Sequence, residues 1–325
     1  MLPLGVIIPT RNSMSLLPGH LARLSAWIHE AREVVCVDSF STDGTLALLK
    51  AGLKHPRLKI LSHPPGLYPS WNFGIQQITS SYVYIATVGD VIRPDGLRHL
   101  IETAQRFQSE LVLSPPRFRS TRGQVLESKQ WTIHQYLEAL RITAPRPLPR
   151  SHLFISSVFA GTSGMMGSSA SNLYEATLLQ RHPFPADFAH IGDTAWGVQN
   201  ALRVRSAITP EPCADFVIHP NEGRFRRDKQ AELEEKLLTA AREVLRDAVT
   251  TGAIPPGAED LMGIFDKYEI HHRQEQAWDD AYYRRRKSTF PWFFDPSAWK
   301  ARATRDRHSQ IVENLWLQTL DRFSF

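Results

Sequence analysis

Polar and acidic side chains end three apolar runs within the first ninety residues of the chain. The segments are "PTRN" at 9–12, "DSFSTDGT" at 38–45 and "VGD" at 88–90. Each offers backbone amides together with hydroxyl, amide or carboxylate groups, which can hold a nucleotide or a divalent cation. If the apolar runs are parallel strands of one open sheet, their carboxyl ends meet at the edge where such sheets bind ligands. We therefore expect a nucleotide site at this edge.

The elements that must position these segments alternate between short apolar runs and helical spacing. This alternation predicts βαβ units around a parallel sheet. The runs are continuously apolar, which is typical of strands covered on both faces. We predict strands over 4–9, 33–38, 58–63 and 82–88, and helices over 16–27, 43–54 and 70–79.

The remainder of the chain changes character after its last predicted strand, at 215–220. Before it, "ELVLSPPRF" (110–118) indicates a strand, residues 161–181 a Gly/Ser turn running into a helix, and 192–204 a helix. After it, charged helices carry an apolar stripe at helical spacing. We predict an α/β domain over residues 1–224 and a helical extension over 225–325. The stripe consists of Leu233, Leu237, Ala241, Val244 and Ala248.

The composition of the 325 residues is that of an ordinary globular protein, with 42% hydrophobic and 22% charged residues. A net charge of +5 and a pI near 9.3 mildly favour acidic partners such as nucleotides, nucleic acid or an anionic membrane. Cys36 and Cys213 lie in apolar surroundings, as in a reduced protein. No signal-peptide pattern or bilayer-length apolar run occurs. We expect a cytoplasmic protein that at most lies on the inner face of the membrane.

Four motifs, in this order, resemble the start of a family 2 glycosyltransferase of the GT-A fold. They are "GVIIPTRN", "EVVCVDSFSTDGT", "WNFGI" and "YIATVGDVIRPDGL", where the family shows "IIPTYN", "VVDDGSTDGT", "ARNxGI" and "DADD" before "xPDxL". A fifth, "GDTAWGVQNAL", is similar to the family's "EDxxxxxR" helix. The resemblance implies a Rossmann-like, mostly parallel sheet flanked by helices. It also implies inverting transfer of a sugar from a nucleotide diphosphate, with UDP expected, to a glycan or lipid-linked acceptor.

The resemblance implies nucleotide-binding roles at the first two strand ends. Pro9, Thr10 and Asn12 would hold the nucleotide, and the carboxylate of Asp38 would accept the ring N–H of the base. Asp43 is better explained as a cap that bonds the amides of its own helix. Asn72 of "WNFGI" would help shape the nucleotide pocket, although a core-helix role explains that stretch equally well.

The turn after the fourth strand lacks most of the family's acids. When "RPDGL" is aligned, "DADD" falls on residues 87–90, so that Thr87 and Gly89 replace the first two acids and Asp90 alone remains. The resemblance implies that Asp90 binds the donor and, with phosphates and water, Mg²⁺ or Mn²⁺. The alternative is a turn-forming acid beside glycine.

Basic residues follow the last predicted strand in "VIHPNEGRFRR" (217–227). The resemblance implies that His219 is a second metal ligand and that Arg224, with its neighbours, binds the diphosphate. The alternatives are a structural histidine and a solvated charge cluster.

Asp193 matches the family's catalytic base, a carboxylate that deprotonates the acceptor hydroxyl. The family's preceding glutamate is Gly192 here. The alternative role of Asp193 is a helix N-cap. Acceptor choice is expected to depend on the loops around 115–165.

Two functions of other classes remain open. A non-catalytic member of the fold would bind sugar nucleotides or glycans without turnover, as the eroded acid motif allows. A nucleic-acid-associated protein would use the basic aromatic tail "YYRRRKSTFPWFF" (282–294), but would leave the ordered motifs unexplained, so nucleic acid is a disfavoured partner. The tail offers a peripheral membrane contact as well. We expect instead that its aromatic residues pack on the core.

Overall fold

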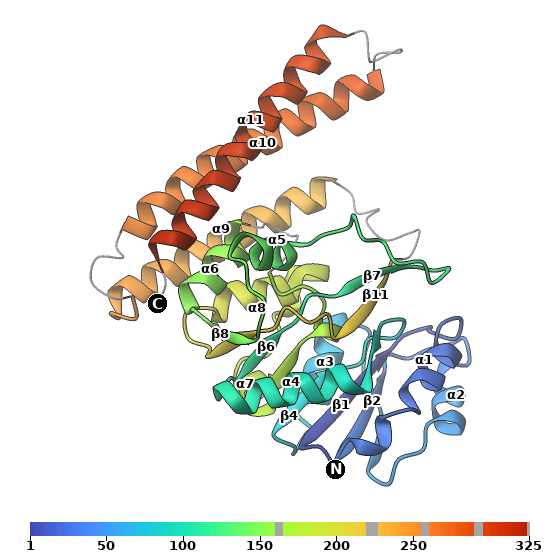
Figure 1. The fold of residues 1–325 in the computed structure, drawn as a ribbon. Coiled ribbons are helices and arrows are strands. Elements are labelled where there is room, and N and C mark those ends of the chain that lie inside the picture. Colours follow the sequence, from blue (N-terminus) through green and yellow to red (C-terminus); the bar gives the residue numbers. More distant parts are fainter. Residues whose placement is uncertain (160–164, 219–226, 255–259, 289–294, 324–325) are drawn as a thin grey trace.

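The computed structural model of the chain describes residues 1–159, 165–218, 227–254, 260–288 and 295–323. Its centre is an eight-stranded sheet with helices on both faces (Figure 1). The strand order is β3-β2-β1-β4-β9-β6-β10-β8. The bounds are β1 Leu4–Thr10, β2 Glu33–Asp38, β3 Leu58–Ser62, β4 Tyr82–Ile85, β6 Leu111–Leu113, β8 Arg146–Leu148, β9 Leu173–Glu175 and β10 Ser206–Ile208.

The first four strands in space, β3, β2, β1 and β4, are all parallel. β1 pairs with β2 in a register that sets Thr10 beside Asp38. β4 ends at Ile85 rather than at residue 88 as predicted, because the chain turns there and Gly89 adopts a left-handed φ of 111°. The predicted polar strand ends therefore meet at one edge of the sheet.

Strand β9 was not predicted, because residues 161–181 were expected to run from a turn into a helix. It pairs antiparallel with both β4 and β6 and thereby joins the two halves of the sheet. Leu173 and Tyr174 are buried there. A strand of three residues is too short to show a period of two in the sequence.

A second, three-stranded sheet consists of β5 (Val91–Ile92), β11 (Ala214–Ile218) and β7 (Arg117–Ser120). The single strand predicted over 110–118 is wrong: it divides into β6 and β7. Pro115 and Pro116 separate the two parts, since proline cannot donate a ladder hydrogen bond. β11 confirms the predicted strand at 215–220 as far as Ile218.

Two apolar clusters cover the two faces of the main sheet. Val6 and Ile8 of β1 pack with α1 and α4, whereas Ile7, between them, packs with α3 and α8. This alternation follows from the period of two along a strand. The helices in this part are α1 Leu17–Leu24, α2 Thr45–Gly52, α3 Leu67–Ile75, α4 Pro94–Phe107, α5 Thr132–Ala139, α6 Arg150–Phe159, α7 Ala176–Arg181 and α8 Gly192–Asn200.

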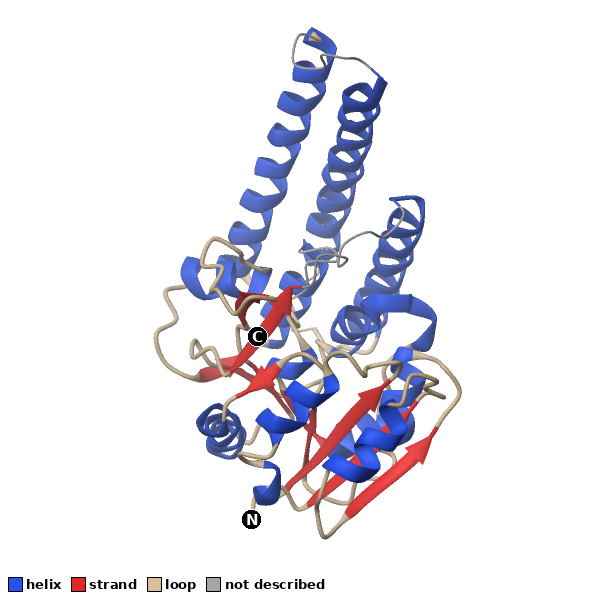
Figure 2. Ribbon diagram, turned by 90° about the vertical axis from the view of Figure 1, so that its right-hand side faces the viewer, coloured by secondary structure: helices blue, strands red, loops and turns tan. Residues whose placement is uncertain are grey.

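Three long helices form the C-terminal part: α9 (Arg227–Thr250), α10 (Asp260–Ser288) and α11 (Pro296–Arg322). The predicted apolar stripe of α9 is confirmed, because Leu237 and Ala241 are buried in one cluster with α6 and α8. α10 and α11 form a hairpin that projects away from the sheet (Figures 1 and 2). The predicted boundary at residue 224 lies outside the described residues.

Candidate functional site

The loops after β1 and β2 are tied together at the sheet edge. Thr10 Oγ1 donates to Asp38 Oδ1 at 3.0 Å. The hydroxyl and amide of Ser41 donate to the two Asp38 oxygens at 2.6 and 3.0 Å. These bonds hold Asp38 at 1% exposure. Asp38 therefore orders the loop in this structure, and its contact with a nucleobase stays a prediction.

Asn12 continues this connection between the loops. It adopts a left-handed φ of 47°, which asparagine tolerates better than most residues. Its Oδ1 accepts from the Thr42 amide, and its own amide donates to Ser41 Oγ, both at 2.9 Å. Pro9, on β1 opposite Val37, precedes the loop. The two segments predicted to hold the nucleotide thus form one rigid rim.

Asp43 is bonded as a helix cap would be. Its Oδ1 accepts from the amide of Thr45 at 3.1 Å and from its hydroxyl at 2.6 Å, at the start of α2. Its Oδ2 accepts from the Met14 amide at 3.0 Å. These hydrogen bonds, led by that from the Thr45 hydroxyl, lower the pKa of Asp43. The expected bonding of the following helical turn is confirmed at Thr45, although Gly44 is the N-cap residue.

Asp90 lies at a junction of three segments. Ser168 Oγ donates to its Oδ2 at 3.4 Å, the Val217 amide of β11 donates to its Oδ1 at 3.3 Å, and its own amide bonds the Thr87 carbonyl at 3.2 Å. The left-handed Gly89 gives the turn its shape. Asp90 is therefore held by both sheets as well as by the segment around Ser168.

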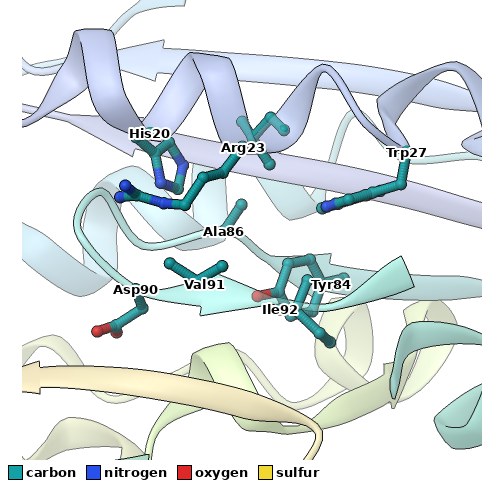
Figure 3. Close-up of a pocket in the computed structure, with 9 residues that line it drawn as sticks. His20, Arg23, Trp27, Tyr84, Ala86, Asp90, Val91 and Ile92 are labelled. Carbon is teal, nitrogen blue, oxygen red and sulfur yellow. The ribbon is translucent and has the colours of Figure 1, made fainter. Parts of the chain in front are cut away.

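The buried imidazole of His20 lies over this turn (Figure 3). It borders a cavity of about 10 Å³ that Arg23, Tyr84 and Asp90 also line. That volume holds no part of a nucleotide. Burial, with a smaller effect from Arg23, lowers the pKa of His20 to about 4, so the ring is neutral at physiological pH.

The described residues hold no cluster of three or more His, Cys, Asp or Glu side chains of the kind that binds metals. Asp90 is the only acid among the four residues of the 87–90 turn. Two further predicted donor-side residues, His219 and Arg224, lie outside the described residues. The described part of the site thus fits a metal held by one carboxylate, with its remaining ligands supplied by phosphate and water.

Asp193 lies in the first turn of α8 and is partly exposed. Its Oδ1 lies 2.8 Å from the amide of Thr194 and 3.1 Å from the Tyr68 hydroxyl. Burial raises the pKa of Asp193 to about 6, against the smaller lowering effects of these two hydrogen bonds. A carboxylate that is reachable and titrates near neutrality can act as a general base.

Gly192 explains why the glutamate of the family motif is missing. A Cβ atom on Gly192 would lie 2.4 Å from the Tyr68 ring and 2.7 Å from the carbonyl oxygen of Pro185. No side chain fits in that space. The tyrosine that bonds Asp193 therefore excludes an acid at the preceding position.

Asn72 and Tyr68, four residues apart on α3, both reach the segment that leads into α8. The Asn72 side chain donates to the Phe184 carbonyl at 2.8 Å and accepts from the Phe184 amide at 3.0 Å. Asn72 thus anchors the segment before Asp193, which is the structural role that was the alternative to nucleotide binding. Its part in the nucleotide pocket stays a prediction. Tyr68 was missed, although its spacing of four from Asn72 places both on one helix face.

The segment from Met166 to Tyr174 connects the surroundings of the two acids. Ser168 contacts Asp90, and the Asn172 amide donates to the Met166 carbonyl at 2.6 Å and to the Tyr174 hydroxyl at 3.4 Å. Burial raises the pKa of Tyr174, and the charge of Asp193 adds to this rise. One buried segment thus borders both the donor edge and the candidate base.

A groove of about 600 Å³ opens beside β7 and α5. It mixes apolar side chains with charged ones from the stretch that was expected to determine acceptor choice. Its volume is that of a small-molecule site. Residues that line it include Pro116, Phe118, Leu126, His134, Leu137 and Ile142.

Part of the chain matches a family of known proteins. Residues 5–163 match the family described as glycosyl transferase family 2. The succinoglycan biosynthesis protein ExoO of Rhizobium meliloti (strain 1021) is 25% identical over 217 residues, which are 66% of this chain and 60% of that protein. The match therefore spans about 60% of the length of that relative.

Solved structures of S. aureus TarS 1–349 share the fold. The complex with UDP-GlcNAc has a TM-score of 0.52 and the complex with UDP 0.51, each at 17% identity over 97% of this chain and 91% of that one. These matches confirm the predicted GT-A architecture. None of the described helices is both long and apolar enough to cross a bilayer.

Proposed function

We propose that this chain, a glycosyltransferase whose residues 5–163 form a family 2 domain, moves a sugar from a UDP-linked donor to a hydroxyl group of a glycan or lipid-linked acceptor. The observation that carries the proposal is Asp193, a partly exposed carboxylate whose pKa is raised to about 6. It lies across the segment 166–174 from the donor edge. UDP is supported by the two TarS complexes, which contain UDP and UDP-GlcNAc.

In the proposed reaction, Asp193 accepts the proton of the acceptor hydroxyl. The acceptor oxygen then bonds to the anomeric carbon from the face opposite the leaving group. The bond between that carbon and the phosphate oxygen breaks, UDP leaves with the electron pair, and the sugar is inverted. Tyr68 holds the carboxylate by donating to it and remains protonated, because burial raises its pKa.

Donor binding is assigned to the sheet edge. The rim formed by Pro9, Thr10 and Asn12 would hold the nucleoside, with Asp38 toward the base after a rearrangement of its bonds to Ser41. Asp90, Thr87 and Gly89 would border the diphosphate. Mg²⁺ or Mn²⁺ bound at Asp90 would neutralise the charge of the leaving group.

The pathway is proposed from the relative alone. Because ExoO is a succinoglycan biosynthesis protein, we infer that the acceptor here is a growing polysaccharide or its lipid-linked precursor. A cytoplasmic location is supported by Cys36 and Cys213, which are free and fully buried.

Titration calorimetry of UDP, first with Mn²⁺ and then with chelator, tests the donor site on wild type and Asp90→Ala. Micromolar binding that requires both the metal and Asp90 is the expected result. UDP binding that is equally strong with and without the metal would indicate that basic residues, rather than a metal ion, bind the phosphates. No binding of UDP or other nucleoside diphosphates would refute the donor site.

A UDP-release assay beside this titration separates the enzyme from a non-catalytic member of the fold. The reduction of the acid motif to Asp90 is the observation that favours the latter. A protein that binds UDP but releases none from UDP-sugars, with or without candidate glycan acceptors, would support that alternative. UDP release that Asp193→Asn abolishes, while UDP binding persists, supports the enzyme.

A further inference from the structure

The hairpin of α10 and α11 packs on α6 at its base, and α9 contacts α10 as far along as Gln276. At the base, the Tyr268 hydroxyl donates to the Val158 carbonyl of α6 at 2.8 Å, and Trp316 Nε1 donates to Ser156 Oγ at 3.1 Å. Leu261, Phe265 and Leu320 are buried at the same level. α10 alone has 29 residues and thus a length of about 40 Å. Most of the hairpin therefore extends beyond the domain (Figures 1 and 2).

Beyond Tyr268, polar contacts join the two helices of the hairpin. His271 and His308 face each other at 3.1 Å, and Arg305 bonds Asp279 at 3.1 Å and lies 5.5 Å from the centre of the Tyr282 ring. The expectation that the aromatic tail packs on the core is wrong for its described residues. Neither Tyr282 nor Tyr283 belongs to an apolar cluster of the domain, because the hairpin carries both away from it.

The sequence that spans the end of α10 and the start of α11 is rich in aromatic and basic residues. Residues 281–300 contain seven aromatic residues, five Lys or Arg and one acid, whereas aromatic residues make up 10% of the whole chain. Trp299, one turn into α11, is 51% exposed, and the neighbouring Lys300 is exposed. Arg284 is exposed near the end of α10. The end of α10 and the start of α11, which carry Arg284, Trp299 and Lys300, thus lie where the hairpin is farthest from the sheet (Figure 1).

We propose that this end of the hairpin, defined by Arg284, Trp299 and Lys300, docks on an anionic lipid bilayer. Indole rings partition into the interface between headgroups and acyl chains, where an apolar ring and a polar N–H are both accommodated. Lysine and arginine beside them are attracted to anionic headgroups. The hairpin then anchors the catalytic domain at a distance from the bilayer while its base stays packed on α6. This binding requires neither donor nor acceptor.

Vesicle flotation of the full chain tests the proposal, with phosphatidylcholine vesicles and with vesicles that also contain 30% phosphatidylglycerol. We expect the protein to bind the anionic vesicles at least tenfold more strongly than the neutral ones. Its binding to the anionic vesicles should weaken at 0.5 M salt. Arg284→Glu/Lys300→Glu should weaken binding at least tenfold, and Trp299→Ala severalfold. The matched control, Arg246→Glu/Lys267→Glu, reverses two exposed charges on α9 and near the base of α10 and should bind as wild type.

Thermal unfolding and UDP titration of each variant show that it is folded. Equal loss in the control and tip variants would overturn the proposal, since net charge alone would then explain the binding. Unchanged binding of all tip variants would also overturn it. Binding to single-stranded oligonucleotides without binding to vesicles would overturn the proposal as well. The end of the hairpin would then be a nucleic-acid-binding site. Vesicle binding without UDP binding would leave this inference intact and refute only the proposed reaction.

Discussion

The hydroxyl of Tyr68 lies 3.1 Å from a carboxylate oxygen of Asp193 and ties α3 to the first turn of α8. The same tyrosine ring occupies the space that a side chain at Gly192 would need. One residue thus fixes the candidate base and removes the acid that the family motif places before it. The candidate base is thus a single carboxylate, whose pKa is raised by burial and lowered in part by this contact.

The pH dependence of transfer should report the Asp193 carboxylate. With a pKa of about 6, it is charged and active above that pH, so kcat/KM should rise as pH increases through about 6 and then level off. Tyr68→Phe removes a hydrogen bond that lowers this pKa, so the rising limb should move to higher pH. Initial rates from pH 5 to 8.5 on both proteins measure the shift. If the rising limb of the pH profile of Tyr68→Phe stays in place or moves to lower pH, the hydrogen bond between Tyr68 and Asp193 does not lower the pKa of Asp193.

Asp193→Asn should reduce the transfer rate about 10²- to 10⁴-fold, as expected for loss of a general base. Donor affinity should be retained, because Asp193 belongs to the acceptor side. Single-turnover transfer and UDP calorimetry on the same preparation separate the two effects. If the Asp193→Asn variant retains the transfer rate of the wild type, the Asp193 carboxylate only caps α8.

The same substitution should stabilise the protein at neutral pH. A carboxyl with a pKa raised in the folded state contributes stability below its unfolded pKa of about 4, and loses that contribution as pH rises through about 6. At pH 7.5, Asp193→Asn should therefore increase the free energy of unfolding by about 1–2 kcal/mol, after allowance for its partial exposure. Urea denaturation at pH 7.5 and pH 4.5 tests this. The gain should be clearly smaller at the lower pH, where the folded carboxyl is protonated.

Gly192→Ala should destabilise the fold by about 1–3 kcal/mol, since the added methyl group meets Tyr68 and the Pro185 carbonyl. Gly263→Ala in α10 is the matched control, because its new Cβ meets nothing within 4 Å. The control should gain roughly 0.5–1 kcal/mol from helix propensity. Thermal unfolding of both variants compares them. Equal tolerance at the two sites would mean that Tyr68 is not packed against Gly192.

Asp38→Asn and Ser41→Ala together decide what Asp38 does. If its carboxylate only orders the loop, both variants should weaken UDP and other nucleoside diphosphates alike, because each removes hydrogen bonds within the rim. If it also binds the uracil ring, only Asp38→Asn should lose the preference for UDP over GDP. Competitive calorimetry with the two nucleotides distinguishes these outcomes.

Local patterns in the sequence were sufficient for the parallel half of the sheet. Each of β1, β2 and β4 is a short apolar run with polar groups at its end, and such runs fix both the strand and the edge where its ligands meet. The capping of α2 by Asp43 and the apolar stripe of α9 were predictable for the same reason. In each case the signal lies within a few residues along the chain.

Tertiary structure decided the rest. β9 exists only because β4 and β6 flank it, and the contacts of Tyr68 and Asn72 with Asp193 and Phe184 join residues more than a hundred positions apart. The raised pKa of Asp193 follows from burial, which has no local sequence signal. The sequence by itself determined which residues are candidates for the chemistry and where the strands β1, β2, β3 and β4 run. Contacts between residues far apart in the sequence decided the rest. They determine which of those side chains hydrogen-bond within the loops and which remain accessible to a substrate.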